Sequence, residues 1–187
     1  MKRAVLLVFL IPALLLAGDY KEGFQSLLWG DSLATVKRKY PKGKLHEGIW
    51  MVKQKTANLP AMLGMEFLED KLWAVHVIFD LENTGQKRYL DEFQRLEAIL
   101  TEKYGKPQNT VRENRSPVLT EDHVLDDLSA IALDEGEYED DWSTHESFIM
   151  LRLSGGGFQL NLSIFYGCIE LMKKHHEIQK KKDEGEL

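Results

Sequence analysis

The sequence predicts an α+β protein in which helices pack on an antiparallel β-sheet. Two stretches with apolar residues at helical spacing end alike, on Lys-Tyr, a chain-breaking residue and a second Lys: LATVKRKYPKGK (33–44) and LEAILTEKYGKP (96–107). Each is followed by segments with the period-2 alternation of strands. The order of helix and then strands occurs twice, so we expect two helix-plus-hairpin half-repeats, about 18–86 and 87–170, within one domain over 18–170.

Residues 1–17 have the composition of a secretory signal peptide. Lys2 and Arg3 precede an apolar run from Ala4 to Leu16, and small residues follow before the first acid. The run is shorter than the roughly 20 apolar residues that cross a bilayer. We expect cleavage after Ala17, a mature chain without a transmembrane segment, and a periplasmic or secreted location.

The first helix has two suitable N-caps, Asp31 and Ser32, and Pro41 prevents its continuation. Its apolar stripe consists of Leu33, Val36 and Tyr40. GIWMVKQK (48–55) is the first strand that the alternation predicts.

MLGMEFLEDKLWAVHVIFD (62–80) predicts a hairpin with its turn at 69–71. In the second arm, strict alternation places one set of side chains on each face: Trp73, Val75, Val77 and Phe79 on the first, and Leu72, Ala74, His76 and Ile78 on the second. Both sets are apolar. This predicts a central strand that is covered on both faces, or whose second face meets a partner.

The second helix is predicted from a stripe that runs over two heptads: Tyr89, Phe93, Leu96, Leu100 and Tyr104. Gly105 suits the left-handed position after the last turn, and Pro107 prevents the helix from resuming. After it the chain becomes acidic, and 120–141 holds no Lys or Arg. We interpret 108–141 as an acidic insertion or long loop, with VLDDLSAIAL (124–133) as a candidate short helix. A solvated loop is the first interpretation of its charge, and attraction of a basic partner is the alternative. A final hairpin, SFIMLRL (147–153) and GFQLNLSIFY (157–166), and a charged helical tail over 171–187 complete the chain.

The net charge of −6 argues against a nucleic-acid partner, because such a partner requires a basic face. Cys168 is the sole cysteine, so the fold has no intrachain disulfide to stabilise it. Its apolar surroundings favour an inert buried thiol. Motifs of nucleophilic catalysis such as Gly-x-Ser-x-Gly do not occur in the sequence, and no cofactor motif does. We therefore expect a protein that is not an enzyme and has no cofactor.

The order LLWGDSLATVKRKY, FLEDKLWAVHVIFD, LEAILTEKYGKP, Trp142 and LNLSIFYGCIEL resembles a group of uncharacterised bacterial secreted or periplasmic envelope proteins with a WG…KYGKP…W…Y pattern. It also looks like the β-lactamase-inhibitor-protein type of fold, and a related helix-pair-plus-hairpin unit occurs in the small lipoprotein of the outer-membrane barrel-assembly machinery. The resemblance covers most of the mature chain except the acidic insertion and the tail. It implies a protein-binding or accessory function in the cell envelope, with another envelope protein as the partner.

Two sets of residues are candidates for binding. Aromatic residues at or beside strands, which anchor protein interfaces, and one mid-strand histidine form the first set: Trp50, Trp73, His76 and Trp142. Hard oxygen ligands in the acidic stretch form the second, as a weak Ca²⁺ site: Asp134, Glu137, Glu139 and Asp141. The second set supports a small-molecule or metal-ion binding protein as the alternative. A hydrolase that uses His76 is the least favoured hypothesis, and the oligomeric state stays open.

Overall fold

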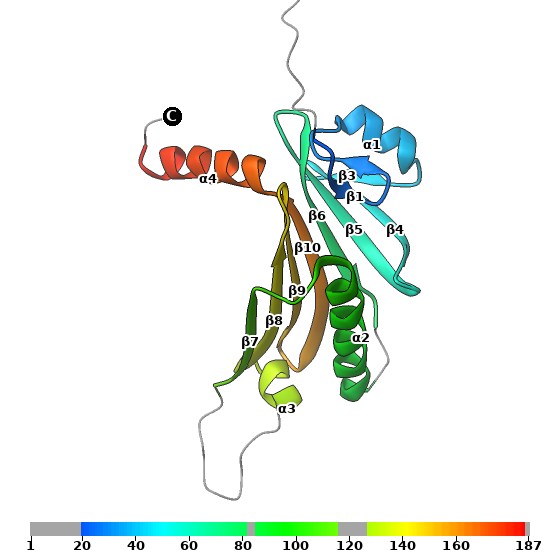
Figure 1. Ribbon diagram of the computed structural model, residues 1–187, viewed down its shortest axis with the longest axis vertical. Helices are drawn as coiled ribbons and strands as arrows, with labels where there is room; N and C mark the ends of the chain where they lie inside the picture. The colour runs from blue at the N-terminus through cyan, green and yellow to red at the C-terminus, as the bar shows by residue number, and fades with distance from the viewer. Residues whose placement is uncertain (1–19, 82–84, 116–126, 186–187) are drawn as a thin grey trace, which may run out of the picture.

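The computed structural model describes residues 20–81, 85–115 and 127–185, which form ten strands and four helices (Figure 1). The predicted signal peptide, 1–17, lies outside the described residues. An eight-stranded antiparallel sheet has the order β3-β4-β5-β6-β10-β9-β8-β7. Its strands are β3 (Lys44–His46), β4 (Ile49–Thr56), β5 (Leu59–Leu68), β6 (Lys71–Phe79), β7 (Asn109–Asn114), β8 (Gly136–Ser143), β9 (Ser147–Gly156) and β10 (Gln159–Cys168). The predicted α+β class with helices and an antiparallel sheet is confirmed.

The other elements are two short strands that pair with each other and four helices. These are β1 (Gly23–Phe24), β2 (Leu27–Leu28), α1 (Leu33–Lys39), α2 (Gln86–Tyr104), α3 (Asp127–Ala132) and α4 (Ile169–Asp183). Ser32 caps α1 by accepting a hydrogen bond from the Thr35 amide at 3.3 Å. Gly105 ends α2 with a φ of 85°, which the sequence predicts. Among the described helices, none is both long enough and apolar enough to cross a membrane.

Two-residue turns with positive φ at both positions join β3 to β4, β4 to β5, β5 to β6 and β9 to β10. Such turns match the right-handed twist of antiparallel strands. The pairs are Glu47–Gly48, Ala57–Asn58, Glu69–Asp70 and Gly157–Phe158. The predicted turn between β5 and β6 is therefore confirmed. These tight turns fix the register, and with it the face on which each side chain lies.

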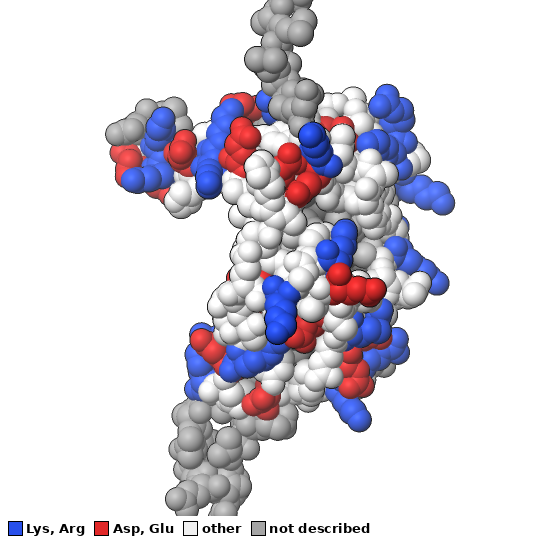
Figure 2. All heavy atoms as spheres, in the orientation of Figure 1, with Lys and Arg blue, Asp and Glu red and all other residues white. Residues whose placement is uncertain are grey.

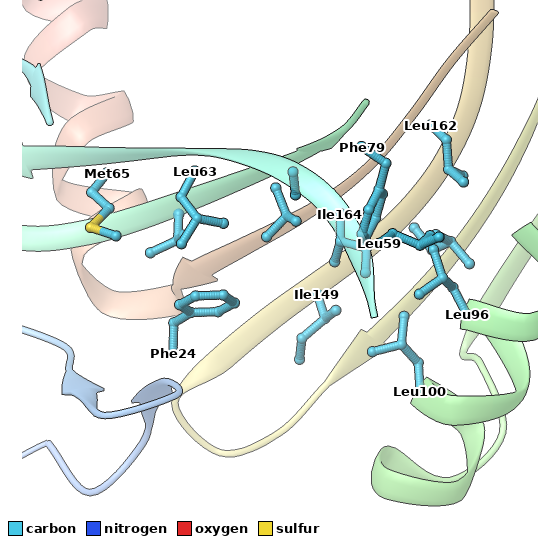
Figure 3. Close-up of a cluster of buried hydrophobic side chains, with 14 of the residues drawn as sticks. Phe24, Leu59, Leu63, Met65, Phe79, Leu96, Leu100, Ile149, Leu162 and Ile164 are labelled. Atoms are coloured by element: carbon cyan, nitrogen blue, oxygen red, sulfur yellow. The ribbon is translucent and has the colours of Figure 1, made fainter. Parts of the chain in front are cut away.

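The hydrophobic core lies on one face of the sheet, where α1, α2 and α3 pack. Two rows of paired residues cross the strands on this covered face: Trp50–Met65–Val75–Tyr166–Ile149–Trp142 and Val52–Leu63–Val77–Ile164–Leu151–Asp140. Figure 3 shows Leu96 and Leu100 of α2 directed toward Ile149 and Ile164 of the sheet, and Phe24 of β1 closing the core near Leu63. Each fully buried large apolar side chain stabilises the fold by roughly 1.5–3 kcal/mol.

One ion pair, between the fully buried Asp140 and Arg112, whose side chain is 33% exposed, interrupts this apolar row. Asp140 is fully buried, and Arg112 of β7 donates to both of its carboxylate oxygens, at 3.1 and 2.9 Å. The guanidinium lies 4.9 Å from the Phe93 ring centroid and 5.0 Å from that of Tyr138. Burial, together with the bond to Asp127, raises the pKa of Tyr138 to about 12. Arg112 thus joins β7, β8 and α2 in one structural cluster.

The predicted faces of β6 are wrong at its beginning. Glu66 pairs with Ala74 and Phe67 pairs with Leu72, so Trp73 is the extra residue of a β-bulge. The Trp73 ring lies 6.4 Å from Phe165, which is the partner of His76 on β10. Trp73 therefore shares a face with His76 and not with Val75. Strict alternation missed this because a bulge reverses the two faces before it.

The interpretation of 108–141 as an insertion or long loop is wrong where the structure has strands, whereas the short helix predicted within 124–133 corresponds to α3. Residues 109–114 form β7, 127–132 form α3 and 136–143 form β8, while 116–126 lie outside the described residues. The segment GEYEDDWS is acidic in composition but alternates as a strand does. Tyr138, Asp140 and Trp142 lie on the covered face. The predicted helical tail corresponds to α4, which begins at Ile169.

Candidate functional site

The sheet face opposite α1, α2 and α3, called the open face below, is the candidate site. Pairing places two rows across it: Met51–Gly64–His76–Phe165–Met150–Asp141 and Lys53–Met62–Ile78–Ser163–Arg152–Glu139. The base of α4 covers one end of this face, against β6 and β10. Elsewhere the described helices leave it uncovered.

The centre of the open face is apolar although it is accessible. Ile78 is 43% exposed, and the neighbouring side chains of Met62, Met150 and Phe165 are half-buried. The solvated face of an antiparallel sheet usually carries polar side chains. A contiguous apolar patch on such a face is typical of a binding surface.

An aromatic cluster lies where α4 meets the open face. Phe165 is its centre, with its ring centroid 5.0 Å from His76, 6.4 Å from Trp73 and 6.3 Å from Phe148. His175 of α4 stacks on Trp73 with ring centroids 4.7 Å apart. Aromatic rings at these separations attract each other and hold the cluster in one arrangement.

Gly167 allows α4 to approach the sheet beside this cluster. A Cβ at Gly167 would lie 2.5 Å from Met172 Sδ and 2.8 Å from the Phe165 ring. Any side chain here would displace α4 or Phe165. The sequence of β10 thus permits the close approach by which Met172 covers one edge of the aromatic cluster.

His76 forms an ion pair with Glu66 across the open face, with 2.9 Å between Nε2 and Oε1. The hydrogen bond from His76 is the main cause of a lowered pKa of Glu66, aided by the charges of His76 and His175 and opposed by burial. The side chain of His76 is 41% exposed. Its ring is therefore held between the Glu66 carboxylate and the Phe165 ring.

Replacing His76 with Leu is expected to raise the pKa of Glu66, because both the donor and the positive charge are lost. A carboxyl with a lowered pKa in the folded state adds stability above its ordinary value of 4.5, and that stability is lost as the pH falls through the folded pKa. The advantage of the natural chain over His76→Leu should therefore shrink below pH 4.5. NMR titration of Glu66 Cδ measures the change. His76→Gln, which keeps a donor, is the control and should raise the pKa less; an unchanged pKa in His76→Leu contradicts the assignment.

Three carboxylates, Glu137, Glu139 and Asp141, form an acidic row on the open face of β8. Arg152 of β9 contacts two of them, with Nε 3.0 Å from Glu137 and 3.7 Å from Glu139. Burial, followed by the charge of Asp141, raises the pKa of Glu139. Burial also raises the pKa of Asp141, whose Oδ1 is buried without a hydrogen-bond partner. Negative charge thus exceeds positive charge along this row.

The predicted Ca²⁺ ligands do not converge. Glu137, Glu139 and Asp141 follow one another at every second position of a strand, and Asp134 lies in the turn between α3 and β8. The carboxylates of Glu137 and Glu139 are directed to the Arg152 guanidinium and not to a shared ion site. Within the described ranges, no group of three or more His, Cys, Asp and Glu side chains is arranged to hold a metal ion.

The structure separates the four aromatic and histidine candidates into two pairs. Trp50 and Trp142 belong to the covered face and are only 8% and 1% exposed. Trp50 Nε1 donates to the Tyr40 carbonyl at 3.2 Å, and Trp142 Nε1 donates to that of Gly105 at 2.9 Å. Both are core residues. Trp73 and His76 do come together on the open face, joined by Phe165.

Sequence reasoning missed Phe148, Met150, Arg152 and Phe165 as members of the site. A signal for one of them was present, because the alternation of β10 placed Phe165 among polar residues on the wet face. An aromatic residue at such a position is typical of a contact surface.

A groove continues the open face at the end of β6. It has a volume of about 1160 Å³, and its lining includes Lys53, Lys55, Ile78 and Phe158. Phe158 is 79% exposed and has a φ of 67°, an unfavourable conformation for a bulky side chain. This φ belongs to the two-residue turn between β9 and β10, which places Phe158 beside the groove.

Comparison of the chain with protein-family models, with curated proteins and with solved structures gave no significant match.

Proposed function

We propose that this chain is a non-catalytic protein-interaction module of the bacterial cell envelope and that it binds its partner through the open face. The accessible apolar centre of that face, with Ile78 43% exposed in the middle of the sheet, is the observation that carries the proposal. Trp73 and Phe165 are aromatic anchors of the kind that dominate interface energetics. His76 and the acidic row add polar groups at the rim.

The size of the open face fits a protein partner. The sheet has eight strands that lie about 4.8 Å apart, and a strand of eight residues is about 27 Å long. The area of the open face is therefore on the order of 900 Å². A stable protein–protein interface buries about 800 Å² on each partner. A face of this area is wider than a small-molecule pocket and suits a protein partner, and the groove beside Ile78 continues it.

The absence of an enzymatic role is part of the proposal, and two observations support it. Burial raises the pKa of the Cys168 thiol, so the sulfur is a poor nucleophile at neutral pH. His76, the candidate base of a hydrolase, is paired with Glu66 and lies on a broad sheet face next to Phe165. Among the described residues, Glu66 is the polar partner that contacts the His76 ring, and no nucleophile is placed beside it.

The two halves of the sheet support the proposed duplication. In each half a helix precedes four strands, α1 before β3–β6 and α2 before β7–β10, and α3 lies between β7 and β8 in the second half. The last strands of the halves, β6 and β10, pair antiparallel, as in Val77 opposite Ile164. An approximate two-fold axis between these strands would relate the halves. Duplication would join two four-stranded halves into one eight-stranded face, whose area is large enough for a protein partner.

The envelope location rests on the signal-like sequence at 1–17 and is part of the same proposal. The test is affinity capture of the tagged mature chain from an envelope extract, washed at low and then at moderate salt. We expect stoichiometric retention of a partner protein at low salt and its release as salt screens the acidic row.

Ile78 and Ile99 provide matched variants for this capture. Both are exposed isoleucines, at 43% and 40%, but Ile78 lies on the open face and Ile99 on α2. Ile78→Asp should abolish retention, whereas Ile99→Asp should leave it unchanged. Circular dichroism and the melting temperature establish that both variants fold. Equal retention by the two variants contradicts the proposal.

A further inference from the structure

Helix α4 extends away from the rest of the molecule. Only Leu171 of its fifteen residues is buried. Three contacts hold its first half: His175 on Trp73, Met172 over Gly167, and an ion pair of Lys174 with Glu69. Figure 1 shows α4 projecting on the side away from α2, and Figure 2 shows a hollow between α4 and the body below it.

The outer half of α4 has features of a helix that packs on something. A helix of about 15 residues is marginal in water without tertiary contacts. On the side of α4 that carries Met172 and His175, the next residue is Ile178, beyond the last of the contacts named above. Its last turn carries Lys180, Lys181 and Lys182. The outer half thus offers one apolar residue, Ile178, followed by three lysines, of which Lys180 forms an ion pair with Glu184.

The acidic row is complementary to this end of α4. Glu137, Glu139 and Asp141 have Arg152 as their cationic neighbour across the strand, and one buried oxygen of Asp141 has no hydrogen-bond partner. Burial and mutual repulsion raise the pKa of Glu139, so a further cation beside the row would be favourable. The row borders the apolar centre of the open face through Met150, which pairs with Asp141.

We propose that a second copy of this chain covers the open face, in a two-fold dimer in which the lysine-rich end of α4 from each copy lies against the acidic row of the other. This names the partner of the proposed interaction surface and rests on that function. In a two-fold interface a contact of one surface with another occurs twice, so both acidic rows and both helices are used. The apolar centres supply the affinity, and the charges fix the register.

Sedimentation velocity of the mature chain over about 1–100 µM tests the dimer, a range that detects micromolar dissociation constants. We expect a dimer at low salt that weakens as salt increases. The first variant, Lys180→Glu/Lys181→Glu/Lys182→Glu, should weaken dimerisation at least about tenfold, because like charges then meet. The control triple, Lys42→Glu/Lys87→Glu/Lys106→Glu, changes the net charge equally at exposed positions outside α4 and the acidic row, and should retain the dimer.

The second variant inverts the row while keeping its internal ion pairs: Glu137→Lys/Glu139→Lys/Arg152→Glu. Alone this variant should also be monomeric, because its lysine-bearing row would lie against the unchanged lysines of α4 from a second copy. An equimolar mixture of the two variants should form a heterodimer, since both contacts are then between opposite charges. Recovery on mixing also shows that each variant is folded.

Failure of this inference differs from failure of the proposed function. A chain that stays monomeric throughout, or a mixture that does not recover, overturns the dimer. A dimer that persists in the α4 variant or in Ile78→Asp overturns it as well. If a different envelope protein is still captured and is lost with Ile78→Asp, the interaction function stands with another partner.

Discussion

Replacing Arg112 with Met is expected to lower the free energy of unfolding by about 3–5 kcal/mol, the usual cost of leaving a buried charge without its partner. Asp140 is fully buried and depends on the two hydrogen bonds that Arg112 donates to it. Urea denaturation followed by circular dichroism measures the change. The loss should be among the largest for any position outside the apolar core.

Two further variants identify the cause. Arg112→Lys keeps the charge but loses the paired hydrogen bonds and the stacking between Phe93 and Tyr138, so an intermediate loss is expected. The double variant Arg112→Met/Asp140→Leu removes both charges and should be more stable than Arg112→Met alone. A loss below about 1 kcal/mol for Arg112→Met would place the pair among weak surface ion pairs and contradict this description.

Trp142→Ala is expected to destabilise the fold by about 3–5 kcal/mol, because a large side chain leaves a cavity that its neighbours fill only in part. Trp142 is 1% exposed, and its indole donates a hydrogen bond to the Gly105 carbonyl at the end of α2. Denaturation curves report the loss. Trp142→Phe, which removes the hydrogen bond but keeps most of the volume, should cost less.

Trp73→Ala provides the contrast. Trp73 is half-buried, and its neighbours are Phe165 and His175. Its removal should cost less stability than Trp142→Ala but should reduce capture of a partner. A Trp142→Ala variant with natural stability, or a Trp73→Ala variant with full binding and the larger loss of stability, reverses the roles given to these two residues.

Helix ends and turns could be predicted from the sequence because their causes are local. Ser32 caps α1, Gly105 ends α2 at positive φ, and Glu69–Asp70 form the turn between β5 and β6. Each depends on the chemistry of a few adjacent residues.

The position of Trp73 and the strand character of β8 depend on pairing with distant residues. The bulge at Trp73 exists only in register with Glu66 and Phe67, and an isolated strand pattern does not reveal it. In β8, the acids that suggested a loop are accommodated because Arg112 and Arg152 come from neighbouring strands. Charge composition alone therefore gave the wrong structure for this segment.

The candidate site was predicted in part. Trp73 and His76 lie on the open face, while Trp50 and Trp142 are core residues. Tryptophan is common both in cores and in interfaces, so its presence beside a strand does not decide between them. The side of the sheet that the helices cover decides it, and that is a property of the assembled fold.

Photo-cross-linking from two positions tests the open face as the interaction surface most directly. A benzophenone amino acid replaces Ile78 in one version of the mature chain and Ile99 in the other, two positions of nearly equal exposure. After irradiation in the envelope extract, position 78 should yield a cross-linked product that contains a second copy of the chain or another envelope protein, and position 99 should yield none. Cross-links from position 99 alone, or equal yields from both, would contradict the assignment of the open face.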